Sequence, residues 1–251
     1  MQPPRPGRNE RLFMNAPLER KAYRYFTPVT AIFVTVLVIS NIIAVKLVSF
    51  WGLTLPAAVI LFPISYIFGD ILTEVYGYAN ARKVIWTGFF CNLLAVAAIW
   101  AGGLLPYSSF WTIGGYTSPA SAQQAYTAIL GFTPRLLVAS FIAYLCGEFL
   151  NSFVLAKLKL ITAGKFLWVR TISSTIVGEG VDAAIFITIA FAGILPTGAL
   201  LTTILSQWLF KVSYEVLATP LTYLVVNFLK KKENEDYFDR DTNFSPVSFR
   251  S

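Results

Sequence analysis

The chain has 251 residues, a formal net charge of +7 and 56% hydrophobic residues, but only 13% of its residues are charged. Its mean hydropathy is +0.63, whereas a soluble domain carries charge on about a quarter of its residues. The composition therefore excludes an ordinary soluble domain and predicts an all-α, polytopic membrane protein.

The chain begins with a Pro- and Arg-rich stretch, residues 1–27, that has no apolar core, so we expect a basic cytoplasmic tail rather than a cleaved signal peptide. A bilayer crossing needs about 20 apolar residues. The apolar windows that follow predict six transmembrane helices, over residues 28–49, 55–76, 84–105, 134–156, 170–193 and 198–229. They make up a membrane domain, 28–229, which is followed by a second cytoplasmic tail, 230–251.

Among the predicted tails and connections, basic residues occur on one side of the membrane only. They precede the first window and follow the second, fourth and sixth, at Arg5, Arg8, Arg11, Arg20, Lys21, Arg24, Arg82, Lys83, Lys157, Lys159, Lys165, Lys230, Lys231 and Lys232. The alternate connections, near 50–54, 106–133 and 194–197, contain no Lys or Arg. The positive-inside rule therefore places both termini in the cytoplasm. The net charge indicates contact with anionic lipid and not with nucleic acid.

The long outer connection, 106–133, is uncharged and aromatic. Gly114 and Gly115 suit a tight turn, and Pro119 precedes an Ala-rich run that predicts a short interfacial helix. This segment is either a lid over an outward-facing cavity or a packing element at the headgroups.

Six carboxylates interrupt the apolar windows, at Asp70, Glu74, Glu148, Glu179, Asp182 and Glu215. An acid in hydrocarbon costs several kcal/mol unless it faces a polar cavity or a partner. Their number predicts a polar route or binding site inside the membrane, and hence transport.

Asp70 and Glu74 are four residues apart and share a helix face, which Tyr66 flanks. They are either buried acids that meet a ligand or a cation, or a solvated helix end beside Arg82 and Lys83. The sequence leaves both alternatives open.

Glu179 and Asp182 share a face near the middle of the fifth helix, and Arg170 precedes them. On the sixth helix, Lys211 and Glu215 are spaced as an ion pair that neutralises itself, which is a structural alternative to ligand binding. The candidate substrate-binding residues also include polar side chains elsewhere in the helices, at Asn41, Lys46, Asn92, Glu148 and Gln207.

The sequence lacks the residues that several kinds of catalysis and metal binding require. The chain has no histidine and no Gly-rich phosphate loop, and its two cysteines, Cys91 and Cys146, lie in apolar windows without a metal-binding spacing. We therefore predict no catalytic site, no metal, no cofactor and no ATP hydrolysis by this chain.

Several motifs resemble those of the queuosine precursor transporter family. They are SNIIAVK at 40–46, LFPISYIFGDILTEVYG at 61–77, WVRTISST at 168–175, Val181-Asp182, and Gln207, Lys211, Glu215 and Pro220. The resemblance covers most of 28–229. It implies import of a 7-deazaguanine base, used to build a modified tRNA base, across the bacterial inner membrane.

Members of this family are similar in architecture to the substrate-binding subunits of energy-coupling-factor vitamin importers, so a capture subunit of an ATP-driven importer is the alternative function. Those subunits tend to carry Ala-x-x-x-Ala in the first helix, where this chain has Ala31 and Thr35. The resemblance thus implies no obligatory ATPase partner. Gly102 and Gly103 permit a homodimer without requiring one.

The chemistry of the implied ligand indicates how it would bind. A guanine-type edge offers two adjacent N–H donors and one carbonyl acceptor, and a carboxylate accepts both donors. We expect Glu179 or Asp182 to take the donors, with Asn41, Gln207 and Lys211 completing the lining and Asp70 or Glu74 opposite. Candidates for stacking on the ring are Phe62, Tyr66, Trp168 and Phe186. Proton coupling and facilitated diffusion are both open.

Overall fold

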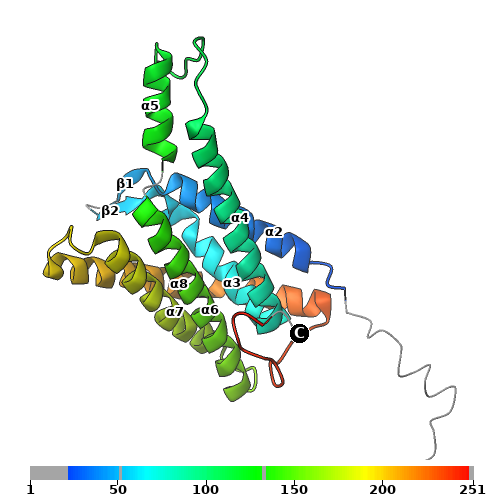
Figure 1. Ribbon diagram of the computed structural model, residues 1–251. Coiled ribbons are helices and arrows are strands. Elements are labelled where there is room, and N and C mark those ends of the chain that lie inside the picture. The colour runs from blue at the N-terminus through cyan, green and yellow to red at the C-terminus, as the bar shows by residue number, and fades with distance from the viewer. Residues whose placement is uncertain (1–21, 51–52, 132–133, 249–251) are drawn as a thin grey trace, which may run out of the picture.

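The computed structural model describes residues 22–50, 53–131 and 134–248. Its helices are α2 (Phe26–Ile43), α3 (Phe62–Tyr76), α4 (Tyr78–Leu104), α5 (Pro119–Leu130), α6 (Pro134–Ile161), α7 (Leu167–Phe191) and α8 (Thr197–Glu233) (Figure 1). A short antiparallel hairpin, β1 (Leu47–Phe50) and β2 (Leu53–Pro56), and a 3₁₀ turn, η1 (Ala57–Ile60), connect α2 to α3. The predicted all-α architecture is thus confirmed apart from this hairpin.

Five helical segments in the described residues are long and apolar enough to cross a membrane. They are α2, α4, α7, α8 and the stretch Pro119–Ile161, which holds α5 and α6. The predicted windows at 84–105, 134–156, 170–193 and 198–229 each correspond to one long helix. The last reaches 37 residues, as expected from its length.

The first two predicted windows are wrong in extent. In the window 28–49, the helix ends at Ile43. In the window 55–76, the helix begins only at Phe62, so α3 has 15 residues. The hairpin takes the residues between, where Val48, Phe50 and Thr54 are residue types that favour strands. Pro63 in the first turn of α3 then favours a helix start there.

α3 lies in the middle of the molecule and packs against α2, α4, α6 and α8. Ile67, Ile71 and Val75 recur at helical spacing and are all buried. Asp70 and Glu74 lie on the same helix and are buried as well. The short helix is therefore enclosed by protein, which explains how it carries two acids.

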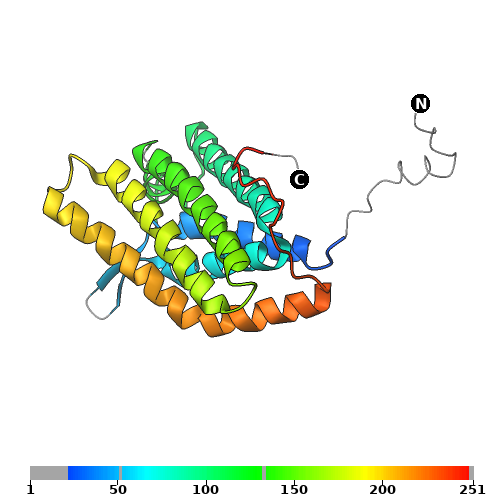
Figure 2. The same cartoon turned by 90° about the horizontal axis from the view of Figure 1, so that it is seen from below.

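α6, α7 and α8 lie side by side (Figure 2). Gly147 of α6 and Gly178 of α7 allow the two helices to meet closely: a Cβ atom built on Gly178 would lie 2.7 Å from the Cβ of Asn151 and 2.9 Å from the Gly147 carbonyl oxygen. Small residues permit this approach between membrane helices. The contact brings Asn151 and Asp182 to the same interface.

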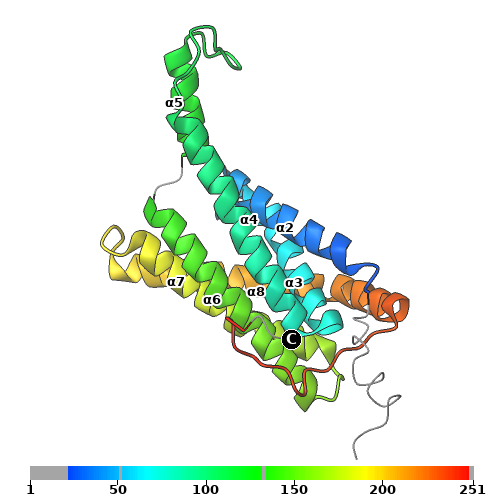
Figure 3. The same ribbon diagram turned by 45° about the vertical axis from the view of Figure 1, so that its right-hand side comes forward.

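The outer half of α4 and the whole of α5 project beyond the other helices (Figure 3). The predicted helix after Pro119 is confirmed, and the Ser118 side chain caps it by accepting from the Ser121 backbone N–H. Gly114 and Gly115 both have positive φ, as the tight turn requires. Gly102 and Gly103 of α4 lie against Tyr126 of α5 within the same chain.

The segment after α8, residues 234–248, folds back over the ends of α3, α4 and α6, where Figure 1 shows it in dark red. We call it the C-terminal strap. Its Tyr237 backbone N–H donates to the Val75 carbonyl, and Arg82 donates to the carbonyls of Asn243 and Ser245. Asp239 accepts from the Tyr78 backbone N–H at the start of α4.

The end of the molecule beneath the strap gathers the chain segments that were predicted to share one side of the membrane. The Tyr25 backbone N–H, just before α2, donates to Glu233 at the end of α8. The Lys159 ammonium of α6 donates to the Glu74 carbonyl of α3. We call this the strap end.

Candidate functional site

Lys211 of α8 joins the two acids of α7. Its ammonium donates to Glu179 Oε2 at 2.7 Å and to Asp182 Oδ2. The expected alternative, in which Lys211 neutralises Glu215 on its own helix, is wrong in this structure. The three groups come together because Glu179 and Asp182 are three residues apart, on the α7 face that packs against α8.

Tyr66 brings an aromatic ring to the same place from α3. The Lys211 ammonium lies 5.5 Å from the centre of the Tyr66 ring. A cation over an aromatic face is attracted to it by the ring's electrons. One cation, two carboxylates and one aromatic ring thus meet at the junction of α3, α7 and α8.

Three more carboxylates lie beside this group on three helices. Asp70 of α3, Glu148 of α6 and Glu215 of α8 are 1%, 5% and 1% exposed. Asp70 interacts electrostatically with both Glu148 and Glu215. Glu148 interacts in turn with Glu179, Asp182 and Lys211. We call the five acids with Lys211 and Tyr66 the interior acid cluster.

Many acceptor atoms of this cluster have no donor. Within the described residues, no hydrogen bond reaches Asp70 Oδ2, Glu148 Oε2 or either carboxylate oxygen of Glu215. The same holds for Asn151 Oδ1 and Gln207 Oε1. Asn151 uses its amide N–H to donate to Asp70 Oδ1 at 2.8 Å. Because buried polar atoms are nearly always satisfied, this surplus of acceptors indicates a site that receives donors from elsewhere.

Glu74 belongs to a different group at the strap end. Its Oε1 atom is 2.7 Å from Arg170, 2.6 Å from Lys230 and 3.5 Å from Lys159. The carboxylate is fully buried, so the idea of a solvated end beside Arg82 and Lys83 does not describe it. Glu74 and Arg170 are therefore paired with each other at the strap end, while Glu74 also acts electrostatically on Asp70 of the interior acid cluster.

Asp236 of the strap extends this ion network, with its Oδ1 atom 2.5 Å from Lys159 and 2.8 Å from Lys230. Burial acts to raise the pKa of Asp236, but the hydrogen bonds and charges of the two lysines outweigh it and lower the pKa below its ordinary value of 3.8. Asp239 is different, because burial raises its pKa despite hydrogen bonds from Thr242 and Tyr78. The strap is thus held to the helices by an ionised Asp236.

Three other candidate residues lie outside both groups. The Asn41 side chain donates to the Leu37 carbonyl of its own helix, Lys46 is exposed after α2, and Asn92 is buried in α4. Of the stacking candidates other than Tyr66, Trp168 is half exposed near the start of α7, Phe186 packs against Phe191, and the Phe62 side chain falls outside the described residues.

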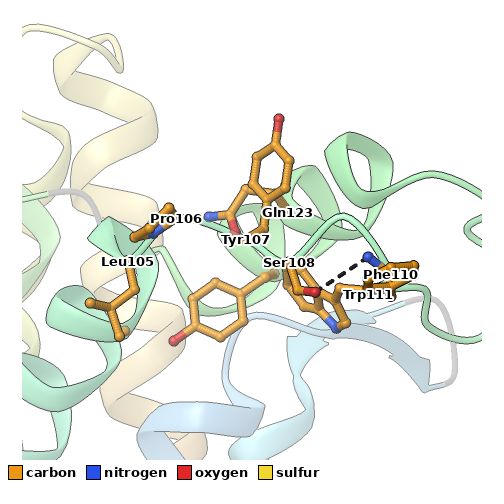
Figure 4. A pocket seen from close by; sticks show the side chains of 9 residues that line it. Leu105, Pro106, Tyr107, Ser108, Phe110, Trp111 and Gln123 are labelled. Atoms are coloured by element: carbon orange, nitrogen blue, oxygen red, sulfur yellow. Dashed lines mark hydrogen bonds between the residues drawn. The ribbon is translucent and has the colours of Figure 1, made fainter.

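A surface cavity of about 530 Å³ lies at the other end of α4, between that helix and α5 (Figure 4). Its lining is aromatic and uncharged, with Tyr107, Phe110, Trp111, Gln123 and Tyr126 among its residues. None of the interior acids lines it. The cavity and the acid cluster are separate features.

Sequence reasoning gave no site role to three groups that the structure connects to the candidate residues. Asn151 is not among the predicted site residues, and the sequence indicates Lys159 and Lys230 only as markers of one side of the membrane. Their partners lie far away in the chain, so helical spacing gives no signal for them. The part of the chain that the structure describes holds no group of three or more Cys, Asp or Glu side chains arranged to bind a metal ion.

Comparisons with known proteins agree with the membrane fold. Residues 56–225 match the family model described as "Putative vitamin uptake transporter". A "Probable queuosine precursor transporter" of Bacillus subtilis is 30% identical over 200 residues, which cover 78% of this chain and 82% of the relative. A protein of the same description from Haemophilus influenzae is 28% identical over 130 residues, covering 52% of this chain and 49% of the relative. No solved structure gives a significant match.

Proposed function

This chain belongs to the vitamin uptake transporter family, and from that premise we propose that it imports queuosine precursors, 7-deazaguanine bases, by holding the base edge between Lys211 and the two acids of α7. The family consists of transporters, so the chain is a multi-pass membrane transporter and not an enzyme. The resemblance seen in the sequence is thereby confirmed.

One observation supports the binding mode best: donor, acceptors and aromatic ring lie together at Lys211, Glu179, Asp182 and Tyr66. A guanine edge presents a carbonyl acceptor next to two N–H donors. Lys211 can donate to the carbonyl while Glu179 or Asp182 accepts from the N–H groups bidentately. The base thus replaces the contacts that Lys211 and the acids make with each other.

Tyr66 and Gln207 complete this site. The Tyr66 ring offers a flat apolar surface for a planar heterocycle, and the buried Gln207 Oε1 atom, which has no donor within the described residues, can accept from the base. A site built from hydrogen-bonding groups discriminates strongly against a ligand that leaves them unpaired.

For orientation, we place the strap end in the cytoplasm of a bacterial inner membrane. The basic residues Arg82, Lys159 and Lys230 lie at that end, as the positive-inside rule requires of a cytoplasmic face. We also propose that transport needs no ATPase partner.

The test is counterflow of radiolabelled 7-cyano-7-deazaguanine in liposomes that contain only this purified chain. Wild type should exchange the base without ATP, whereas Glu179→Gln, Asp182→Asn and Lys211→Met should each slow exchange by about tenfold or more, the loss expected for a charged hydrogen bond. Asp241→Asn, which changes an exposed strap acid, is the matched control.

A second arm uses competitors. Guanine-type 7-deaza bases should compete with the label, whereas a 7-deazaadenine, whose edge reverses the donors and acceptors, should be weaker by about a hundredfold. Wild-type exchange in the Glu179 and Asp182 variants would overturn the proposed site. A chain that exchanges no base unless an ATPase is added would favour the capture-subunit alternative.

A further inference from the structure

Asp70, Glu148 and Glu215 form a group within the interior acid cluster that the proposed base site does not use. They come from α3, α6 and α8, they are at least nine-tenths buried, and they interact electrostatically through Asp70. Glu148 Oε2 also lies against Gly69 of α3, since a Cβ atom built there would be 3.2 Å from it. The three carboxylates therefore converge from different helices.

In the described part of the chain, none of these three carboxylates forms an ion pair with a lysine or an arginine, and Lys211 acts on Glu148 only electrostatically. The Lys211 ammonium is hydrogen-bonded to Glu179 and Asp182, while Lys159, Arg170 and Lys230 are gathered around Glu74 at the strap end. Each buried ion without a partner costs several kcal/mol. Ionisation of all three buried acids at once is thus strongly disfavoured.

Neutral neighbours point to the same need for a donor. Asn151 is only 5% exposed. Its side-chain amide donates to Asp70, and no donor within the described residues reaches its Oδ1 atom. No donor within the described residues reaches either carboxylate oxygen of Glu215. The group has enough hydrogen-bond acceptors but lacks donors.

The base alone cannot supply them. A guanine edge has two adjacent N–H donors, which one carboxylate accepts bidentately, and the proposed site assigns those donors to Glu179 or Asp182. Even if one of the three acids of this group took them instead, the other two would still be left without these donors.

We propose that Asp70, Glu148 and Glu215 together form a proton-binding site, and that the transporter carries protons inward with the base. This inference rests on the proposed function. The charged and titratable groups that face the site from the surrounding elements are Tyr66 and Glu74 on α3, Tyr144 on α6, Glu179 and Asp182 on α7, and Lys211 on α8.

Proton binding also supplies a driving force. A proton entering from outside binds to one carboxylate of the group while the base is bound, and leaves on the inside when the base departs. The membrane potential also favours the inward movement of each positive charge. For one proton per base, a gradient of one pH unit supports about tenfold accumulation.

The experiment uses the full chain in liposomes, with 7-cyano-7-deazaguanine as the probe because this base is uncharged. A trapped pH-sensitive dye reports proton entry while radiolabel reports base entry. We expect addition of the base to acidify the lumen, and an inward pH gradient of one unit to raise accumulation about tenfold over the no-gradient level. Counterflow is measured in the same preparation.

Two variants test the residues. In Asp70→Asn and in Glu215→Gln, proton entry per base imported should fall about tenfold, a ratio that can be compared whatever the rate of base exchange in each variant. Asp241→Asn is again the control, since it changes an exposed acid of the strap. Retained counterflow shows that a variant is folded.

Counterflow without lumen acidification in wild type would overturn the proton site and leave the proposed function standing. Unchanged proton entry in both variants would overturn the assignment to these residues. Absence of counterflow in wild type would instead count against the proposed function on which the inference rests.

Discussion

Lys211 shows how much a single residue decides in a membrane interior. Its side chain is 11% exposed and lies between the carboxylates of Glu179 and Asp182, which are 5% and 20% exposed. Removing one member of such a group leaves the others charged and unpaired. The same property suits a binding site, because a ligand with a matching edge can replace the contacts of the lysine.

We therefore expect Lys211→Met to lower the stability of the ligand-free protein by about 3–5 kcal/mol, the cost of an uncompensated buried charge. Thermal unfolding of the purified protein in detergent measures this. Lys231→Met, at an exposed position on the same helix, should have little effect. Adding Glu179→Gln and Asp182→Asn to Lys211→Met should restore much of the stability, and a triple variant no more stable than Lys211→Met would contradict the ion-pair account.

Among the elements, the α6–α7 pair positions the acids most directly. Gly147 and Gly178 let the helices approach until their backbones touch, and this approach sets Asn151 beside Asp70 and Asp182 beside Gly147. The packing of two glycines thus determines the geometry of side chains from three helices.

Gly178→Ala should separate α6 from α7, because the new methyl group would lie 2.7 Å from the Asn151 Cβ atom. Overpacking of this kind costs about 1–3 kcal/mol. We expect a lower unfolding temperature and slower base exchange together. Gly198→Ala, where an added Cβ atom meets nothing within 4 Å, is the matched control, and equal behaviour of the two variants would contradict close packing at Gly178.

At the scale of the whole molecule, the C-terminal strap ties together the ends of α3, α4, α6 and α8. Its contacts include the Trp86 indole N–H donating to the Pro246 carbonyl and the Tyr78 hydroxyl donating to the Phe244 carbonyl. Lys157 also lies over the Phe244 ring, 3.9 Å from its centre. The strap is part of the folded unit rather than a loose extension.

Truncation after Glu235 should lower the unfolding temperature, because it removes the partners of Tyr78, Arg82 and Lys159. Each lost hydrogen bond is worth about 1 kcal/mol, and more where a charged donor is left buried. Truncation after Ser248 removes only the last three residues of the chain and serves as the control. If both truncations unfold at the wild-type temperature, the strap contacts contribute nothing to stability.

Much of the fold could be predicted from the sequence, because a membrane crossing needs a long apolar run and such runs are visible in the residues themselves. The four later windows became α4, α6, α7 and α8, and the short helix after Pro119 was also recognised. The hairpin before α3 was missed, since an apolar run of that length has no signal that separates strand from helix.

The sequence by itself determined the class of protein, its family and which helix faces carry acids, because these depend on composition, motifs and a fixed helical period. Only the tertiary structure decided which acids are neutralised. Glu74 and Asp70 share a helix face, yet Glu74 lies among three cations, whereas Asp70 accepts from the neutral amide of Asn151. Lys211 likewise contacts α7 rather than Glu215 on its own helix. The partner of a buried charge depends on how neighbouring helices pack, and the spacing of residues along one helix does not determine that packing.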